Sequence, residues 1–235
     1  MLRRIAAALA VGLLAAPPAR AQDLAAVCAQ LVHPPVGAWS QFSMSGGRVN
    51  GATMRMSVVG SERRSDTAYI WLEIAVRGVP MGLPAGVADT LAMVNKLLVT
   101  GFGSGMTDPR EHVMKIGSAP AMTIPVGPAR GGAPAAPVMQ ECSDFKIAGW
   151  ESLTVPGGTF RALHMVGIKA PSDTWVVPDL PFGVVKVVTG GQPADSLQMV
   201  LTAHGMGATS QITEAPRPYD PQALMQMMTG GKPPQ

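Results

Sequence analysis

The side chains that could do chemistry are few and scattered along this sequence. The serine closest to a hydrolase nucleophile is Ser104, in the run Gly101–Gly105, but it stands at the wrong position for a Gly-x-Ser-x-Gly turn. The same run does not fit Gly-x-Gly-x-x-Gly, and no Gly-Lys-Ser/Thr phosphate loop occurs. Metal-ligand spacing is missing from the four histidines, which are His33, His112, His164 and His204. The sequence therefore predicts no enzyme, no metal site and no cofactor.

Two cysteines, Cys28 and Cys142, are the only thiols in the chain. In an oxidising compartment, an isolated pair of this kind is most simply a disulfide. Because the bond would close a very long loop, chain-entropy reasoning gives an upper stabilisation of about 4–5 kcal/mol. The alternative, a redox or metal pair, lacks the Cys-x-x-Cys spacing typical of such sites. We therefore predict a structural disulfide.

Methionine is the most unusual component, with 16 residues against 5 Phe, 2 Tyr and 4 Trp. Met54 and Met56 share one face of a predicted strand, and other methionines stand close to His164 and His204 in the sequence. Methionine can fill irregular gaps in a core or line an adaptable cavity for an apolar ligand. Its thioether also suits copper(I), although the chain has no dense Met-x-x-Met array. Core packing and an apolar cavity are the two favoured interpretations.

Alternation of apolar and polar residues predicts a mainly β fold. The clearest strand covers residues 68–77, and its apolar face consists of Ile70, Leu72, Ile74 and Val76. Comparable segments bring the total to about ten short strands, at 36–44, 52–60, 112–116, 121–126, 145–155, 159–169, 173–177, 183–189 and 196–204. A sheet with that many strands is expected to curl or split.

One segment departs from the strand pattern. Val87, Leu91, Val94 and Leu98 recur at helical spacing, which predicts a helix over 84–99 that packs across the sheet. The predicted fold class is thus mainly β with one or two helices, in which a strongly curved antiparallel sheet, or half-barrel, packs on a helix. A short helix is also expected after Asp23.

Residues 1–21 have the three parts of a secretory signal peptide, which are a basic start, an apolar run over 5–16 and the small-residue site Ala19-Arg20-Ala21. Cleavage before Gln22 would leave a single domain over 22–215 and a flexible tail over 216–235, in the periplasm. The signal holds three of the 18 basic residues and none of the 15 acidic ones, so 18 − 3 = 15 and the mature chain is neutral. A neutral chain has no drive toward nucleic acid, and no later segment is apolar enough to span a membrane.

Several short motifs carry a family resemblance. They are Glu141-Cys142, the runs at 149–160 and 173–176, Leu180–Lys186, and in the first half the runs at 37–39 and 69–73. Together they resemble exported bacterial proteins of the LolA-like lipoprotein-carrier superfamily. The resemblance implies an incomplete β-barrel whose concave face is closed by helices over a hydrophobic cavity. In the best-known members, that cavity carries the acyl chains of lipoproteins.

The leading hypothesis is a non-enzymatic periplasmic carrier of an apolar ligand or a lipid-modified protein. The alternatives are a structural or interaction protein of the cell envelope with a filled core, an enzyme with dispersed residues, and methionine-based copper(I) binding. The sequence does not predict an oligomeric state. The residues expected to line the cavity are Met54, Met56, Ile70, Leu72, Ile74, Val76, Leu91, Val94, Leu98, Leu197, Met199 and Leu201.

Overall fold

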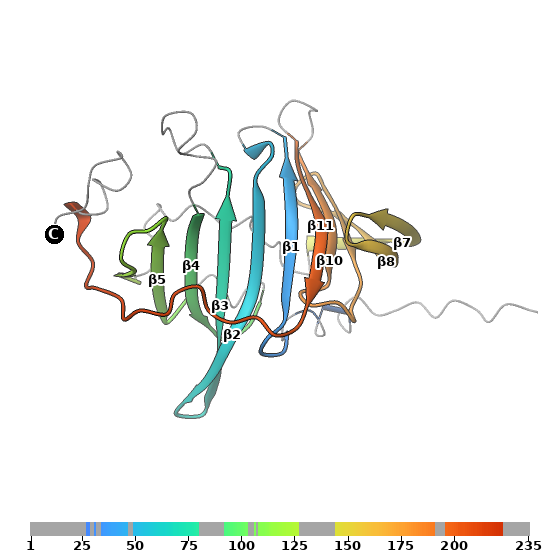
Figure 1. Ribbon diagram of the computed structural model, residues 1–235. Coiled ribbons are helices and arrows are strands. Elements are labelled where there is room, and N and C mark those ends of the chain that lie inside the picture. Colours follow the sequence, from blue (N-terminus) through green and yellow to red (C-terminus); the bar gives the residue numbers. More distant parts are fainter. Residues whose placement is uncertain are drawn as a thin grey trace, which may run out of the picture.

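A computed structural model describes residues 27–28, 31, 34–46, 49–79, 92–102, 106, 108–126, 144–190 and 196–222. Eleven strands form one antiparallel sheet in the order β6-β5-β4-β3-β2-β1-β11-β10-β9-β8-β7 (Figure 1). The strands are β1 (Trp39–Ser45), β2 (Thr53–Arg64), β3 (Thr67–Arg77), β4 (Ala92–Val99), β5 (Glu111–Ile116), β6 (Met122–Ile124), β7 (Phe145–Val155), β8 (Gly158–Gly167), β9 (Ser172–Val176), β10 (Val184–Thr189) and β11 (Leu197–Gly205). The mainly β prediction is confirmed.

The β2–β3 hairpin shows how the sequence pattern becomes structure. Its two strands pair along almost their whole length, from Thr53 opposite Arg77 to Arg64 opposite Thr67. The apolar face predicted for 68–77 is therefore continuous with Met54 and Met56 of β2, because paired residues share a sheet face. The polar connection is shorter than expected, since the strands continue to a tight turn over 65–66.

The helix predicted over 84–99 is wrong for residues 92–99, which form strand β4 between β3 and β5. The reason lies in the spacing of Val94 and Leu98. A separation of four places two residues on one face of a helix, and equally on one face of a strand. Residues 84–91, including Leu91, lie outside the described part of the chain.

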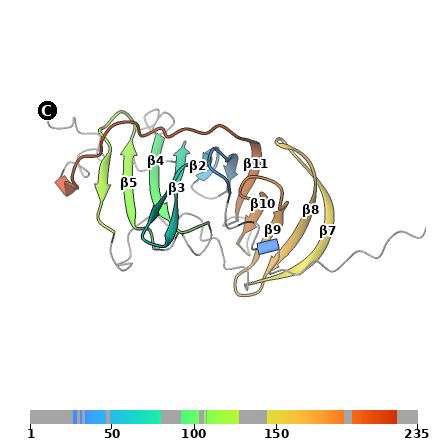
Figure 2. The ribbon, with the colours of Figure 1, turned by 90° about the horizontal axis from the view of Figure 1, so that it is seen from below.

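The expected strongly curved half-barrel is also not what the structure shows. The sheet stays open and is not strongly curled, with β6 and β7 as its two edges (Figure 2). Apolar side chains lie on both faces around β3 and β4, since Leu72 belongs to one buried cluster whereas Ala75 and Val94 belong to another. Both faces of the sheet are therefore buried around β3 and β4.

Near the start of the described chain, Val27, Cys28 and Leu31 have helical backbone, and Val27 and Leu31 pack against a cluster that includes Leu163 of β8. No helix with two or more complete turns occurs in the described ranges. Cys28 is buried there, but Cys142 lies outside the described residues, so the disulfide stays a prediction. The proposed signal, residues 1–21, also lies outside them. In the described ranges, no helix is long and apolar enough to cross a membrane.

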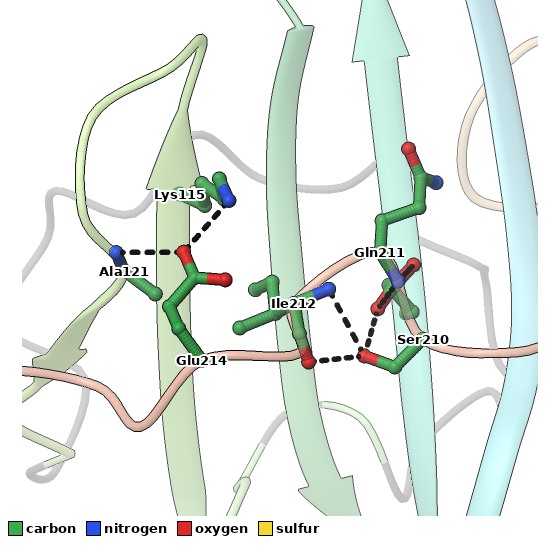
Figure 3. A network of polar contacts seen from close by, with 7 residues as sticks. Lys115, Ala121, Ser210, Gln211, Ile212 and Glu214 are labelled. Carbon is green, nitrogen blue, oxygen red and sulfur yellow. Dashed lines mark hydrogen bonds and ion pairs between the residues drawn. The ribbon is translucent and has the colours of Figure 1, made fainter.

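The last described segment, residues 206–217, crosses the sheet as an extended strap from β11 toward β6 (Figure 1). We call it the C-terminal strap. Figure 3 shows its polar anchors: the Ser210 hydroxyl donates to Glu73 (2.7 Å), and Lys115 donates to Glu214 (2.7 Å). Beyond Glu214 the backbone of Arg217 bonds to both Ala121 and Thr123 (2.8 Å each). The strap therefore covers one sheet face and pairs with the edge at β6.

Candidate functional site

Nine of the twelve residues expected to line a cavity lie together in one buried cluster. They are Met54, Met56, Ile70, Leu72, Ile74, Val76, Leu197, Met199 and Leu201. Strand register explains this, since Met199 of β11 faces Met44 of β1, and β1 in turn pairs with β2. Val94 and Leu98 lie on the opposite face of β4, because they pair with Ala75 and Trp71 of β3. Leu91 lies outside the described residues.

This cluster makes the contacts of a packed core. Phe42, Phe102 and Phe182 are almost fully buried within it. The tip of the β7–β8 hairpin folds back over it, and the backbone N–H of Gly157 donates to the carbonyl of Leu201 (3.0 Å). Met54, Met56 and Met199 therefore lie where the core-packing interpretation places them.

An apolar pocket of about 320 Å³ opens at the end of β11, next to this core. Its lining comes from three segments, which are Leu31 with the prolines that follow it, the loop before β10, and the end of β11 with Met206. The lining residues are Leu31, Pro34, Pro35, Pro178, Asp179, Leu180, Pro181, Phe182, His204, Gly205 and Met206. Leu180, Pro181 and Phe182 belong to the run at 180–186, which carries part of the family resemblance.

The pocket wall contains a strained residue, Phe182, whose φ is +61°. A bulky residue rarely adopts a left-handed backbone, and such strain is maintained only where the surroundings impose it. Here Phe182 is 1% exposed and packs edge-to-face on Phe102, with ring centroids 5.2 Å apart. The loop is also held by the Ser40 hydroxyl, which donates to the carbonyl of Pro181 (2.7 Å). This strain was not predictable from the sequence, since in a Pro-Phe-Gly run the glycine is the expected left-handed residue.

A polar cluster is formed by side chains of β7, β8, β9 and β10. His164 stacks on Trp175 at 4.5 Å, and its Nε2 lies 2.7 Å from Asp173. Glu151 lies 3.7 Å from the Nδ1 of His164 and accepts a hydrogen bond from the indole of Trp175. Lys186 also contacts this tryptophan, and its Nζ lies 4.8 Å from the centroid of the Trp175 ring. Among the described residues no hydroxyl or thiol bonds to His164, so this cluster lacks a nucleophile and is best explained as a surface network.

Metal binding has no support in the described ranges, where no group of three or more His, Cys, Asp or Glu side chains could hold an ion. His112 is half-buried, and its Nε2 lies 2.9 Å from the side-chain oxygen of Asn95. Burial lowers the pKa of His112. That histidine is therefore a satisfied structural residue between β4 and β5.

Comparison with known proteins gives distant structural likenesses. No protein-family model matches the chain, and no curated protein matches it. A predicted lipoprotein of Parabacteroides distasonis is 13% identical, with a TM-score of 0.36, over 74% of this chain and 98% of that one. A predicted exported protein of Bacteroides fragilis with a YmcC-like fold is 10% identical, with a TM-score of 0.35, over 73% and 97%.

The protein MucB is 12% identical, with a TM-score of 0.38, over 82% of this chain and 62% of MucB. MucB from Pseudomonas aeruginosa is also known in complex with MucA, at 10% identity and a TM-score of 0.33. Scores at this level do not establish a shared function.

Proposed function

We propose that this chain is a non-enzymatic protein of the cell envelope that binds one apolar acyl chain in the pocket beside Phe182. The strained, buried Phe182 in the wall of an apolar pocket is the observation that carries the proposal. Backbone strain of this kind clusters at ligand sites, where it fixes the shape of the wall before binding. The export signal predicted over 1–21 supports the location.

The size and lining of the pocket suit a single chain. Its volume of about 320 Å³ lies at the lower end of the range of roughly 300–1,000 Å³ found for small-molecule sites. Most of its wall is proline and aliphatic side chain, and burial of each methylene of a ligand there would contribute about 0.8 kcal/mol. The pocket therefore has room for part of an acyl chain and not for several.

The charges at the pocket indicate which kind of acyl compound fits. Among the described residues that line it, Asp179 and His204 are the titratable ones, and none is a lysine or arginine. A free fatty acid would place its carboxylate near Asp179 with no fixed cation as partner. An acyl ester or amide avoids that repulsion, so we propose an acyl group that is joined to a neutral head.

A matched pair of tryptophan variants tests the proposal. Met206 lines the pocket and is 58% exposed, whereas Ile168 is 62% exposed and lies outside the pocket lining. Met206→Trp should narrow the pocket and weaken binding of a fluorescent neutral acyl amide at least about tenfold, which corresponds to roughly 1.4 kcal/mol. Ile168→Trp adds the same side chain elsewhere and should leave the affinity unchanged.

The competing function is a structural or interaction protein of the envelope without a ligand site. The tightly packed cluster around Met54 and Leu201 favours it. If the wild-type chain shows no saturable binding of the acyl amide, and organic extracts of the purified protein contain no lipid by mass spectrometry, the acyl-binding proposal fails and this second function gains support.

A further inference from the structure

We infer that a second pocket, beneath the C-terminal strap, binds a small hydroxylated molecule that carries a phosphate or carboxylate group. This pocket has a volume of about 500 Å³ and lies between the strap and β1–β3. It is polar, unlike the pocket beside Phe182, and the inference does not depend on the proposed acyl site. The polar side chains that line it from the sheet are Gln41, Thr53, Arg55, Ser57 and Arg77.

Two arginines give the pocket its positive charge. Arg55 of β2 pairs with Ala75, and Arg77 of β3 pairs with Thr53, so the arginines are diagonal neighbours on one face of the sheet. Diagonal neighbours of this kind lie about 7–8 Å apart. In the described part of the chain, neither guanidinium forms an ion pair, and Arg55 contacts only the ring of Trp39, at 4.0 Å from its centroid. An oxyanion between them would offset their mutual repulsion and accept their paired N–H donors.

A serine hydroxyl adds a further polar group to the pocket wall. Ser57 lines the pocket and is 4% exposed. Its hydroxyl can donate to, or accept from, an oxygen of a bound molecule. Thr53, Thr209 and Gln211 add further donors and acceptors around the same space, which suits the hydroxyl groups of a sugar or glycerol unit.

The roof of the pocket is held in place before any ligand binds. On one side, the backbone N–H of Ala208 donates to the carbonyl of Gly37 (2.9 Å). On the other side, the backbone N–H of Gln211 donates to both oxygens of Glu73 (3.0 and 3.1 Å). These bonds hold the Glu73 carboxylate against the strap, and in the described part of the chain it forms no ion pair with Arg55 or Arg77.

The experiment is calorimetric titration of the full chain at low ionic strength with glycerol 3-phosphate and with galacturonate. Arg77→Met should weaken binding at least about tenfold, because it removes a charge-assisted fork. Arg77→Lys should bind with intermediate affinity, since the charge remains and the fork is lost. Arg63→Met removes an exposed cation from the same strand as Arg55 and should leave binding unchanged. Thermal unfolding of each variant checks that it is folded.

A second measurement, of binding to vesicles that contain phosphatidylglycerol, distinguishes a lipid headgroup from a soluble anion. Binding to vesicles alone, lost in Arg77→Met, would identify a lipid headgroup as the ligand, whereas binding of the soluble compounds would identify a free metabolite. Ser57→Ala should weaken either interaction. The inference is overturned if the wild-type chain binds neither the soluble anions nor the vesicles, or if Arg63→Met and Arg77→Met weaken binding equally.

Discussion

Replacement of Ile212 by alanine tests whether the C-terminal strap is an integral part of the fold. Ile212 is 5% exposed and packs in a cluster with Ala75, Val94, Val113 and Ala121, which come from three strands and the turn before β6. Truncation of a buried isoleucine to alanine costs about 2–5 kcal/mol, depending on how far the site can collapse. The strap is a single segment on the outside of the sheet and can move inward, so we expect about 2–3 kcal/mol.

Urea unfolding followed by tryptophan fluorescence measures this loss. For a domain of this size, the same change should lower the Tm by about 4–12 °C. Ile168→Ala is the matched control, because the same side chain is removed at a position that is 62% exposed, and it should cost less than about 0.5 kcal/mol. If Ile212→Ala were no more destabilising than this control, the strap would not be docked on the sheet and the reasoning would be refuted.

Three further predictions concern a glycine and two titrating groups. Gly183→Ala should destabilise the fold by more than about 2 kcal/mol in urea, because Gly183 has a φ of +67° and a Cβ there would overlap Cδ2 of Leu31; an unchanged midpoint would contradict this. The hydrogen bond and charge of Lys115 hold the pKa of Glu214 at about 2, against an ordinary 4.5, so stability present above pH 4.5 should be lost as the pH falls toward 2. In acid titrations followed by circular dichroism, Glu214→Gln should remove the loss of stability between pH 4.5 and about 2 that Glu214 causes, and should leave the rest of the pH dependence unchanged. Burial lowers the pKa of His112 below 6.5, so stability should decrease as the pH falls below 6.5, and an NMR titration midpoint above 6.5 would contradict this.

Local patterns predicted the strands, and they failed where two patterns coincide. Strand β3 was predictable because its apolar residues alternate over a long run, which no helix can satisfy. Strand β4 was not, because Val94 and Leu98 fit both periodicities and the neighbours that decide between them come from β3 and β5. The half-barrel was wrong for a related reason, since alternation marks one apolar face and gives no warning that Ala75 and Val94 are buried on the other.

The two pockets depend on contacts that no local pattern contains. On β3, Glu73 alternates with apolar residues as a solvent-facing residue would, yet it is 1% exposed because Ser210, which is 137 residues away, covers it. The Pro178–Pro181 loop was predictable as a turn, but the left-handed Phe182 was not, because its strain is imposed by Phe102 and Ser40 from distant parts of the chain. Sequence reasoning therefore identified the apolar strand residues and missed what covers them.

The position of β1 between β2 and β11 has a consequence for how the chain acquires its structure during synthesis. The chain is synthesised from its amino terminus, so β1 can pair with β2 as soon as both have been made. The other side of β1 has no partner until residues 197–205 have been made. The sheet face that contains Ala75 stays exposed to solvent even longer, until Ile212 has been made and can cover it. A partly synthesised chain therefore has an unpaired strand edge next to exposed apolar side chains, and both features promote aggregation.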